Sequence, residues 1–273
     1  MARNQGEQRK TPVSQLPRDL VYGRNPVQEA MRHGYLRRAF LLDLNDKRHR
    51  PLREQLATAG VEAEEMAQAP WFPALKGAAH QGAAGIIRRF QGLPLREVVE
   101  KLGPGPAAVI LADGINDPQN LGAVIRDAAA TGAAVILPKH DVPSINCTVH
   151  KAAAGYTFRT PIVLDENLAQ AVAYLQQRDF WVAALDAHEG ESIFDFDFPA
   201  RLGLVVGSEE RRVRHLLRQR SDFLLRIPMA SGVDSLNLSV SVGVVLCFYR
   251  AHMEREARAG SPESPSPDVH SPD

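Results

Sequence analysis

The sequence predicts an α/β protein with a mostly parallel sheet, on three observations. Apolar runs typical of buried strands alternate with helical patterns along most of the chain. At 273 residues, with 44% hydrophobic and 23% charged residues, the chain is long enough for two domains of ordinary globular composition. Three short polar or glycine-containing segments follow predicted strands, which is where doubly wound sheets bind ligands. We therefore expect the function at the carboxyl ends of those strands.

The amino-terminal part, residues 17–90, is predicted to form a small α/β domain after a disordered leader at 1–16. A strand at 19–23 precedes a helix that Asn25 can cap, with Pro26 in its first turn and Gly34 at its end. The same patterns predict strands at 39–44, 61–65 and 85–90, and helices at 51–59 and 70–79.

Residues 91–106 are expected to link this domain to a second one, at 107–256. The linker carries one weak helical pattern, at 95–102, and ends in a Gly-Pro repeat that resists regular structure. In the second domain, strands are predicted at 107–111, 133–137, 162–164, 180–185, 202–206 and 223–227, with helices at 121–131, around 150, and at 166–177, 209–218 and 235–254. The Ser- and Pro-rich tail, 257–273, is predicted to be disordered.

The net charge of zero hides an uneven distribution. Through Phe90 there are 15 Lys and Arg against 9 Asp and Glu, and the rest of the chain has 17 against 23. A basic amino-terminal third is typical either of an exposed solvated surface or of a module that binds a polyanion. Charge alone leaves both open.

Composition excludes several classes of protein. No apolar segment is long enough for a membrane span, and the amino terminus lacks the apolar region of a secretion signal. The chain has two cysteines, Cys147 and Cys247, in apolar or helical contexts, and they are expected to be buried reduced thiols, which suits the cytoplasm. The nine histidines are scattered and no Cys/His group has ligand spacing, so no metal site is predicted.

The first of the three segments, 117–122, is predicted to start a helix. Asn120 and Gly122 would then lie where free backbone N–H groups and the helix dipole favour an anion. Arg126 would face the same site only if the helix begins late and its side chain reaches back. Taken alone, Asn120 is also a good N-cap and Arg126 an ordinary solvated residue.

The other two segments follow the strands at 202–206 and 223–227. Gly207 would allow close backbone approach to a ligand, and Glu209 would start a helix, where acidic residues are favoured anyway. The arginines between 211 and 220 fit a solvated helix face. In the third segment, Ser235 is a natural N-cap, whereas Asn237 would lie inside the helix without favouring it and so requires a partner.

Together these segments resemble the three motifs of the SpoU (TrmH) 2′-O-ribose RNA methyltransferases. The first is Asn120-Leu121-Gly122 with Arg126, the second is 207–209, and the third is 227–229 with 235–239. The resemblance spans about residues 107–250. The amino-terminal domain resembles, through 22–27 and 80–82, the substrate-binding module of the large-subunit rRNA guanosine branch.

This resemblance implies a trefoil knot in the carboxyl-terminal domain, a connection that ordinary topology rules treat as rare. It also implies S-adenosylmethionine as cofactor, RNA as substrate, and a homodimer whose partner chain completes the site. The implied cofactor contacts are Gly207, Ile227, Met229 and Leu236, and the implied active-site residues are Asn120, Arg126, Glu209, Ser235 and Asn237.

The chemistry of 2′-O-methylation limits the role of the arginine. Removing the proton from a free arginine at neutral pH costs about 9 kcal/mol, so we expect Arg126 to orient a hydroxyl or phosphate as a cation. Asn120, Ser235 and Asn237 would fix Arg126 and the loops, and Glu209 would anchor Arg126 or the knot. The chain departs from the family in one place, since Glu210 and Arg212 stand near usual glycine positions.

Three alternatives follow from the same residues. A nicotinamide-dependent dehydrogenase is disfavoured because no predicted strand is followed by G-x-G-x-x-G. A non-catalytic RNA-binding protein that keeps the fold fits the altered second segment. A methyltransferase acting on tRNA, or on another rRNA ribose, differs only in the target, which the sequence does not fix.

Overall fold

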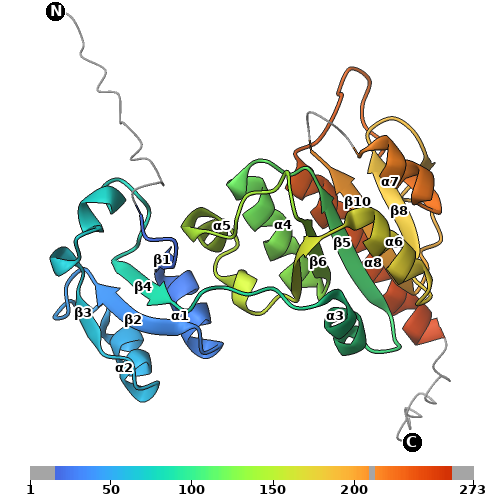
Figure 1. Cartoon of the computed structure of the whole chain (residues 1–273). Coiled ribbons are helices and arrows are strands. Elements are labelled where there is room, and N and C mark those ends of the chain that lie inside the picture. The colour runs from blue at the N-terminus through green and yellow to red at the C-terminus, as the bar shows by residue number, and fades with distance from the viewer. Residues whose placement is uncertain (1–15, 209–212, 260–273) are drawn as a thin grey trace, which may run out of the picture.

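The structure is a computed structural model, and it describes residues 16–208 and 213–259. It contains two sheets, each with its own helices (Figure 1). The smaller sheet lies in the amino-terminal part and the larger one in the rest of the chain. No helix in these two ranges is long and apolar enough to cross a membrane.

The smaller sheet has four strands in the order β1-β4-β2-β3. Strand β4 pairs antiparallel with β1 and β2, while β2 and β3 are parallel. Its strands and helices are β1 (Leu20–Tyr22), α1 (Arg24–Arg32), β2 (Leu36–Leu41), α2 (Arg50–Thr58), β3 (Ala63–Glu65) and β4 (Ala83–Ile87). These match the predicted order. The helix predicted at 70–79 is wrong, because a short 3-10 helix, Phe72–Leu75, stands there after another at Met66–Gln68.

The larger sheet has seven parallel strands in the order β7-β6-β5-β10-β8-β11-β9. They are β5 (Ala107–Asp113), β6 (Ala134–Pro138), β7 (Ile162–Glu166), β8 (Trp181–Asp186), β9 (Glu191–Ser192), β10 (Arg201–Gly207) and β11 (Phe223–Arg226). The predicted α/β class with a large parallel sheet is confirmed. Only the two-residue β9 has no counterpart among the predicted strands.

Helices cover both faces of this sheet, and the central strand β5 shows why. All seven residues of β5 are buried, and alternate residues enter different apolar clusters. Ile110 packs with α4 (Pro118–Thr131), α5 (Cys147–Ala152) and α8 (Leu238–Ala259), whereas Val109 and Leu111 pack with α3 (Leu95–Leu102), α6 (Leu168–Gln176) and α7 (His215–Arg220). Helix α3, predicted from a weak pattern, is therefore part of this core.

The two sheets meet at an aromatic contact. Phe158, in the 3-10 helix Tyr156–Phe158, packs into the apolar cluster of the smaller sheet. Its ring stacks on His150 of α5 at 4.7 Å and lies 5.1 Å from the ring of Tyr35. Burial lowers the pKa of His150 to about 3, so this imidazole is neutral and acts as a packing group. In Figure 1, α5 lies between β1 and α4.

Candidate functional site

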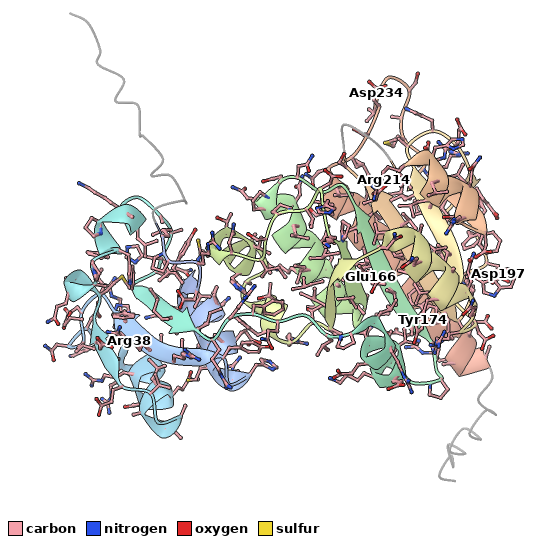
Figure 2. All side chains as sticks on the ribbon, in the orientation of Figure 1. Arg38, Glu166, Tyr174, Asp197, Arg214 and Asp234 are labelled. Atoms are coloured by element: carbon pink, nitrogen blue, oxygen red, sulfur yellow. The ribbon has the colours of Figure 1, made fainter. Side chains whose placement is uncertain are left out.

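A hollow of about 190 Å³ lies at the carboxyl ends of β8, β10 and β11. It contains Ser235 and all four residues to which the family resemblance gave a cofactor contact. Its complete lining is Leu185, Asp186, Ala187, His188, Val206, Gly207, Ser208, Ile227, Met229, Asp234, Ser235, Leu236, Leu238 and Ser241. Figure 2 shows Asp234 on the loop at this end of the large sheet.

The sheet topology explains why residues so far apart in sequence line one hollow. Gly207 is the last residue of β10 and stands in register with Asp113, the last residue of β5. Ile227 directly follows β11. Since parallel strands end at the same edge of a sheet, the segments after β8, β10 and β11 converge there.

A hydrogen bond joins the first and third segments. Asn237 Nδ2 donates to Asn120 Oδ1 at 3.1 Å, across 117 positions of sequence. Asn237 Oδ1 accepts from the backbone N of Ser239 at 3.0 Å and from its hydroxyl at 2.8 Å. Asn237 thus has the partner that its position required, and its amide is oriented by all three bonds.

These contacts revise the predicted start of the last helix. Helix α8 begins at Leu238, so Asn237 stands just before it and its side chain caps the first turn. Ser235 belongs to the preceding loop and lines the hollow. The predicted N-cap role of Ser235 is therefore wrong, and the predicted position of Asn237 inside the helix is wrong as well.

The start of α4 also differs from the prediction. Asp117 caps this helix by accepting from the backbone N of Gln119 at 3.1 Å and of Asn120 at 3.3 Å. Asn120 therefore lies in the first turn, with its side chain on Asn237. Gly122 is buried where α4 crosses α5, and a Cβ there would lie 2.8 Å from the carbonyl oxygen of Val149. Its role is close helix packing, not an open N-terminus for an anion.

Arg126 is exposed and is not among the residues that line the hollow. Because α4 begins at Pro118, Arg126 is more than two turns from the start of the helix, about 12 Å along its axis. Within the described ranges it has neither a hydrogen bond nor an ion pair. Its neighbour Asp127 faces Gly243 of α8, and burial raises the pKa of Asp127 to about 6, partly opposed by the charge of Arg126.

The sequence-based interpretation missed the segment after β8. Asp186 is 4% exposed, and its Oδ1 accepts from the backbone N of His188 at 2.9 Å and of Glu189 at 3.1 Å. Its Oδ2 lies 3.0 Å from a guanidinium nitrogen of Arg218. The carboxylate thus holds the loop that forms one wall of the hollow. The signal was available, since polar residues follow this strand as they follow the other two.

The arginine run between 211 and 220 is not simply a solvated face. Besides Arg218 on Asp186, Arg214 binds Asp113, which is 2% exposed. The Arg214 Nε lies 2.6 Å from Asp113 Oδ1, and its backbone N donates to Oδ2 at 2.8 Å. Both arginines therefore attach the segment after β10 to carboxylates at the ends of neighbouring strands. Arg214 is labelled at this end of the sheet in Figure 2.

Glu209 of the second segment lies outside the described residues, as do Glu210 and Arg212, the two residues near usual glycine positions. In the described ranges, no group of three or more His, Cys, Asp or Glu side chains could hold a metal ion. Both cysteines are free thiols: Cys147 is buried as predicted, whereas Cys247 is exposed on α8, contrary to the prediction.

Solved structures with the same fold cover most of the chain. The SpoU methyltransferase AviRb from Streptomyces viridochromogenes, in complex with the cofactor AdoMet, aligns with a TM-score of 0.70 and 24% identity over 87% of this chain and 90% of its own. An AdoMet-bound rRNA methyltransferase from Sinorhizobium meliloti aligns with a TM-score of 0.69 and 22% identity over 85% and 87%. At these identities the likeness shows the fold alone.

Sequence relatives are more similar. A protein of Pseudomonas putida, named 23S rRNA (guanosine-2'-O-)-methyltransferase RlmB, is 34% identical over 257 residues, which are 90% of this chain and all of that protein. The protein of the same name in Xylella fastidiosa is 36% identical over 199 residues, 71% of this chain and 80% of its own. The sequence profile of the SpoU rRNA Methylase family matches residues 107–247. This chain therefore belongs to the SpoU rRNA Methylase family.

Proposed function

We propose that this protein transfers a methyl group from S-adenosylmethionine to the ribose 2′-hydroxyl of a guanosine in large-subunit rRNA, in the cytoplasm. The observation that carries the proposal is the hollow in which the second and third segments converge, with the first held to the third by the bond from Asn237 to Asn120. Family membership supports the reaction. The relatives that carry the 23S rRNA guanosine name support the target.

The residues of the hollow fit the cofactor. Ile227, Met229 and Leu236 give apolar surface for an aromatic base and the aliphatic part of the methionine chain. Asp186, His188 and Asp234 give acceptors and donors for an ammonium group and ribose hydroxyls. Gly207 leaves the backbone accessible. When bound, S-adenosylmethionine would supply a methyl group on a positively charged sulfur, which an oxygen nucleophile can accept.

The protein's own part is to position the ribose hydroxyl and to stabilise the charge that develops on its oxygen. We assign Asn120 and Asn237 to fixing the start of α4 against the start of α8. Ser235 lies on the rim of the hollow and would contact the ribose or cofactor. Arg126 would hold the hydroxyl or an adjacent phosphate as a cation, with the proton leaving to water. Glu209 would anchor Arg126 or the knot.

A homodimer would explain how Arg126 can act at the hollow although it does not line the hollow of its own chain. The surface next to Arg126 is apolar and open, and it is formed by Asp127 together with one face of α8: Ser239, Val240, Gly243, Val244, Cys247 and Phe248. Val240 is 50% exposed and Phe248 42% exposed. Two copies of this surface packed together would remove it from water and bring Arg126 of each chain toward the hollow of the other.

The path of the chain supports a knot in the carboxyl-terminal domain. The sheet order places β11 beyond β8 and β10, on the far side from β5. The third segment leaves β11 and returns to α4, where Asn237 binds Asn120, before α8 begins. We propose that this return is the trefoil knot that the family resemblance implies. Residues 107–256 would then be the methyltransferase domain, and 17–90, joined through 91–106, the RNA-binding domain.

The test is methylation of unmodified RNA by the purified protein. Labelled S-adenosylmethionine is supplied with 23S rRNA transcript in one reaction and with tRNA transcripts in another, and 2′-O-methyl positions are then mapped. Methylation of a guanosine in 23S rRNA is expected. Label in tRNA alone would support the tRNA alternative, and RNA binding without label in either would support the non-catalytic one.

A further inference from the structure

Away from the hollow, six side chains converge where the two sheets meet, and we call this group the seam. Five come from the amino-terminal part: Tyr22, Arg24, His49, His80 and Gln81. The sixth, Lys151, comes from α5 of the larger part. The seam therefore contains polar groups from both sides of the junction between the sheets.

Gln81 is the centre of the seam. Its Oε1 accepts from the backbone N of Arg24 at 3.2 Å and lies 3.2 Å from Nζ of Lys151. Gln81 adopts φ 54, a left-handed conformation that is uncommon outside glycine. Hydrogen bonds of its neighbours hold this turn, from Gly82 N to His80 Nδ1 at 3.1 Å and from Ala83 N to His80 O at 3.0 Å. Backbone strain of this kind is concentrated at binding sites.

Lys151 is a partly buried cation without an acidic partner in the described ranges. Its Nζ lies so close to the backbone of Gly23 that a Cβ there would be 2.5 Å away, and it is 5.9 Å from the ring centroid of Tyr22. Burial lowers the pKa of Lys151. An ammonium group removed from water without an opposite charge is unfavourable, and an anion bound beside it would relieve this cost.

Arg24 shares this situation. Its guanidinium donates to the carbonyl oxygen of Arg48 and lies 3.4 Å from His49 Nδ1, and within the described ranges it has no carboxylate partner. Four other arginines of the same region do have one: the pairs are Arg32–Glu29, Arg38–Glu64, Arg48–Asp46 and Arg50–Glu54. The basic excess of the amino-terminal third thus leaves an uncompensated cation at the junction with α5.

Packing connects the seam with the candidate site. Lys151 precedes Ala152, and Ala152 packs against Gly122 of α4, two residues after Asn120. Helix α5, which lies between β1 and α4 in Figure 1, therefore contributes Lys151 to the seam and packs against α4, which carries the first motif. A polyanion that crosses α5 would reach both places.

We propose that the side chains of Arg24 and Lys151, whose backbone N–H and ammonium group respectively contact Gln81, bind one backbone phosphate of the RNA. The phosphate would contact both parts of the chain at once and so fix how the amino-terminal part presents RNA to the hollow. A planar guanidinium and an ammonium group are the usual protein ligands of phosphate. His49 and His80 add ring nitrogens that can donate hydrogen bonds. The proposal rests on the proposed function, because it takes RNA as the substrate.

The test is RNA binding by the full chain without cofactor. Affinity for a fluorescent 23S rRNA transcript is measured between about 50 and 200 mM salt for the wild type, Arg24→Gln and Lys151→Gln. Each lost phosphate contact should lower the slope of log affinity against log salt by about 0.7 to 0.9, so the wild type should lose about threefold more affinity than either variant across this range. Lys151→Arg, which keeps the charge, should keep the slope.

Arg38→Gln is the matched control, since Arg38, labelled on the small sheet in Figure 2, is an arginine whose charge is paired with Glu64. It should bind with the wild-type slope. Wild-type slopes for both seam variants, with thermal melts confirming that they fold, would overturn the proposal.

Inorganic phosphate, titrated at constant ionic strength, separates RNA from a free anion. Equal RNA slopes for the wild type and Lys151→Gln, together with Lys151-dependent binding of inorganic phosphate, would overturn the assignment to RNA. Methylation by the wild type is measured separately. If the seam variants have the wild-type salt slope and the wild type methylates RNA, only this inference is rejected. If the seam variants have a lower slope but the wild type does not methylate RNA, only the proposed function is rejected.

Discussion

Two regions of this protein use cationic side chains in opposite ways. At the edge of the large sheet, Arg214 and Arg218 bind Asp113 and Asp186, two carboxylates that are almost fully buried. At the seam, Arg24 and Lys151 have no carboxylate partner in the described ranges; the Lys151 ammonium and the backbone N of Arg24 both contact Gln81 Oε1. In the first arrangement, ion pairs hold loops in place. The second leaves charge available for a ligand, so the location of a cation's partner says more about function than the count of cations.

The comparison predicts its largest effect at Arg126, an exposed cation that stands outside both groups. Arg126→Ala should lower methyl transfer by about a thousandfold, an order expected when a preorganised charge at the reacting group is lost. Folding should change little, because an exposed helix Arg→Ala substitution is usually mild. Arg126→Lys should fail as well, since a point charge does not reproduce a planar fork. Single-turnover methylation and a thermal melt measure both; turnover within about tenfold of the wild type would remove Arg126 from the reaction.

A mixture of two variants tests whether Arg126 acts at the hollow of its own chain or of its partner. If Arg126 serves the hollow of its partner, a mixed dimer of Arg126→Ala with Asn237→Ala contains one complete site. Random mixing of equal amounts should then restore roughly a quarter of wild-type turnover, because half the dimers are mixed and each has one of two sites. Activity that stays at the level of the separate variants would place Arg126 and the hollow in the same chain.

The third segment should show the next largest effect. Asn237→Ala and Ser235→Ala should each lower turnover by about a hundredfold, the order expected for one lost polar contact in a preorganised site. Their stabilities should differ, because Asn237 caps α8 and Ser235 does not. We expect a loss of about 1 kcal/mol of unfolding free energy for Asn237→Ala only. Intact turnover in the Asn237 variant, with the stability loss present, would reduce this residue to a helix cap.

A smaller effect is expected where α4 crosses α5, the packing that links the two regions. Gly122→Ala would place a methyl group 2.8 Å from the carbonyl oxygen of Val149, so the helices must move apart. The free energy of unfolding should fall by about 1–3 kcal/mol, as for other overpacked cores. Gln119→Ala, an exposed change one turn earlier on the same helix, is the control. Equal urea midpoints for the two variants would show that the added methyl group fits between the helices without loss of stability.

The smallest effect concerns Asp127, whose pKa burial raises to about 6 from an ordinary 3.8. Between these values the unfolded chain releases a proton that the folded chain keeps, so rising pH favours unfolding until both forms are ionised. Asp127→Asn should therefore stabilise the protein more at pH 8 than at pH 5. Urea unfolding at the two pH values measures this, with the exposed Glu62→Gln as control. The same gain at both pH values would contradict it.

Sequence patterns predicted most of the fold but not its geometry at the helix starts. The strands of the large sheet were found because a buried parallel strand is a continuous apolar run. Asn120 and Ser235 were given capping positions because their residue types favour them. The structure uses Asp117 and Asn237 instead. Residue type alone does not decide between neighbouring capping residues, and it gives no sign of the tertiary bond between Asn237 and Asn120, which are 117 positions apart in sequence.

In the candidate site too, the sequence predicted some residues and missed others. Gly207, Ile227, Met229, Leu236 and Ser235 could be named from motifs, and the structure places all of them on one hollow. Polar residues follow β8 in the sequence, but the wall formed by 186–188 was missed because the sequence does not show that β8 lies between β10 and β11. The seam could not be predicted from the sequence either. A charge count located the basic region, but only the folded chain shows which cations have carboxylate partners.

The central claim is that the edge of the large sheet performs methyl transfer while the seam holds RNA. Steady-state kinetics with 23S rRNA on Asn237→Ala and Lys151→Gln test it most directly, because the two steps appear in different constants. We predict that Asn237→Ala lowers kcat about a hundredfold with KM for RNA nearly unchanged, and that Lys151→Gln raises KM for RNA several-fold with kcat nearly unchanged. The reverse pattern, or equal effects of both variants on both constants, would contradict the account.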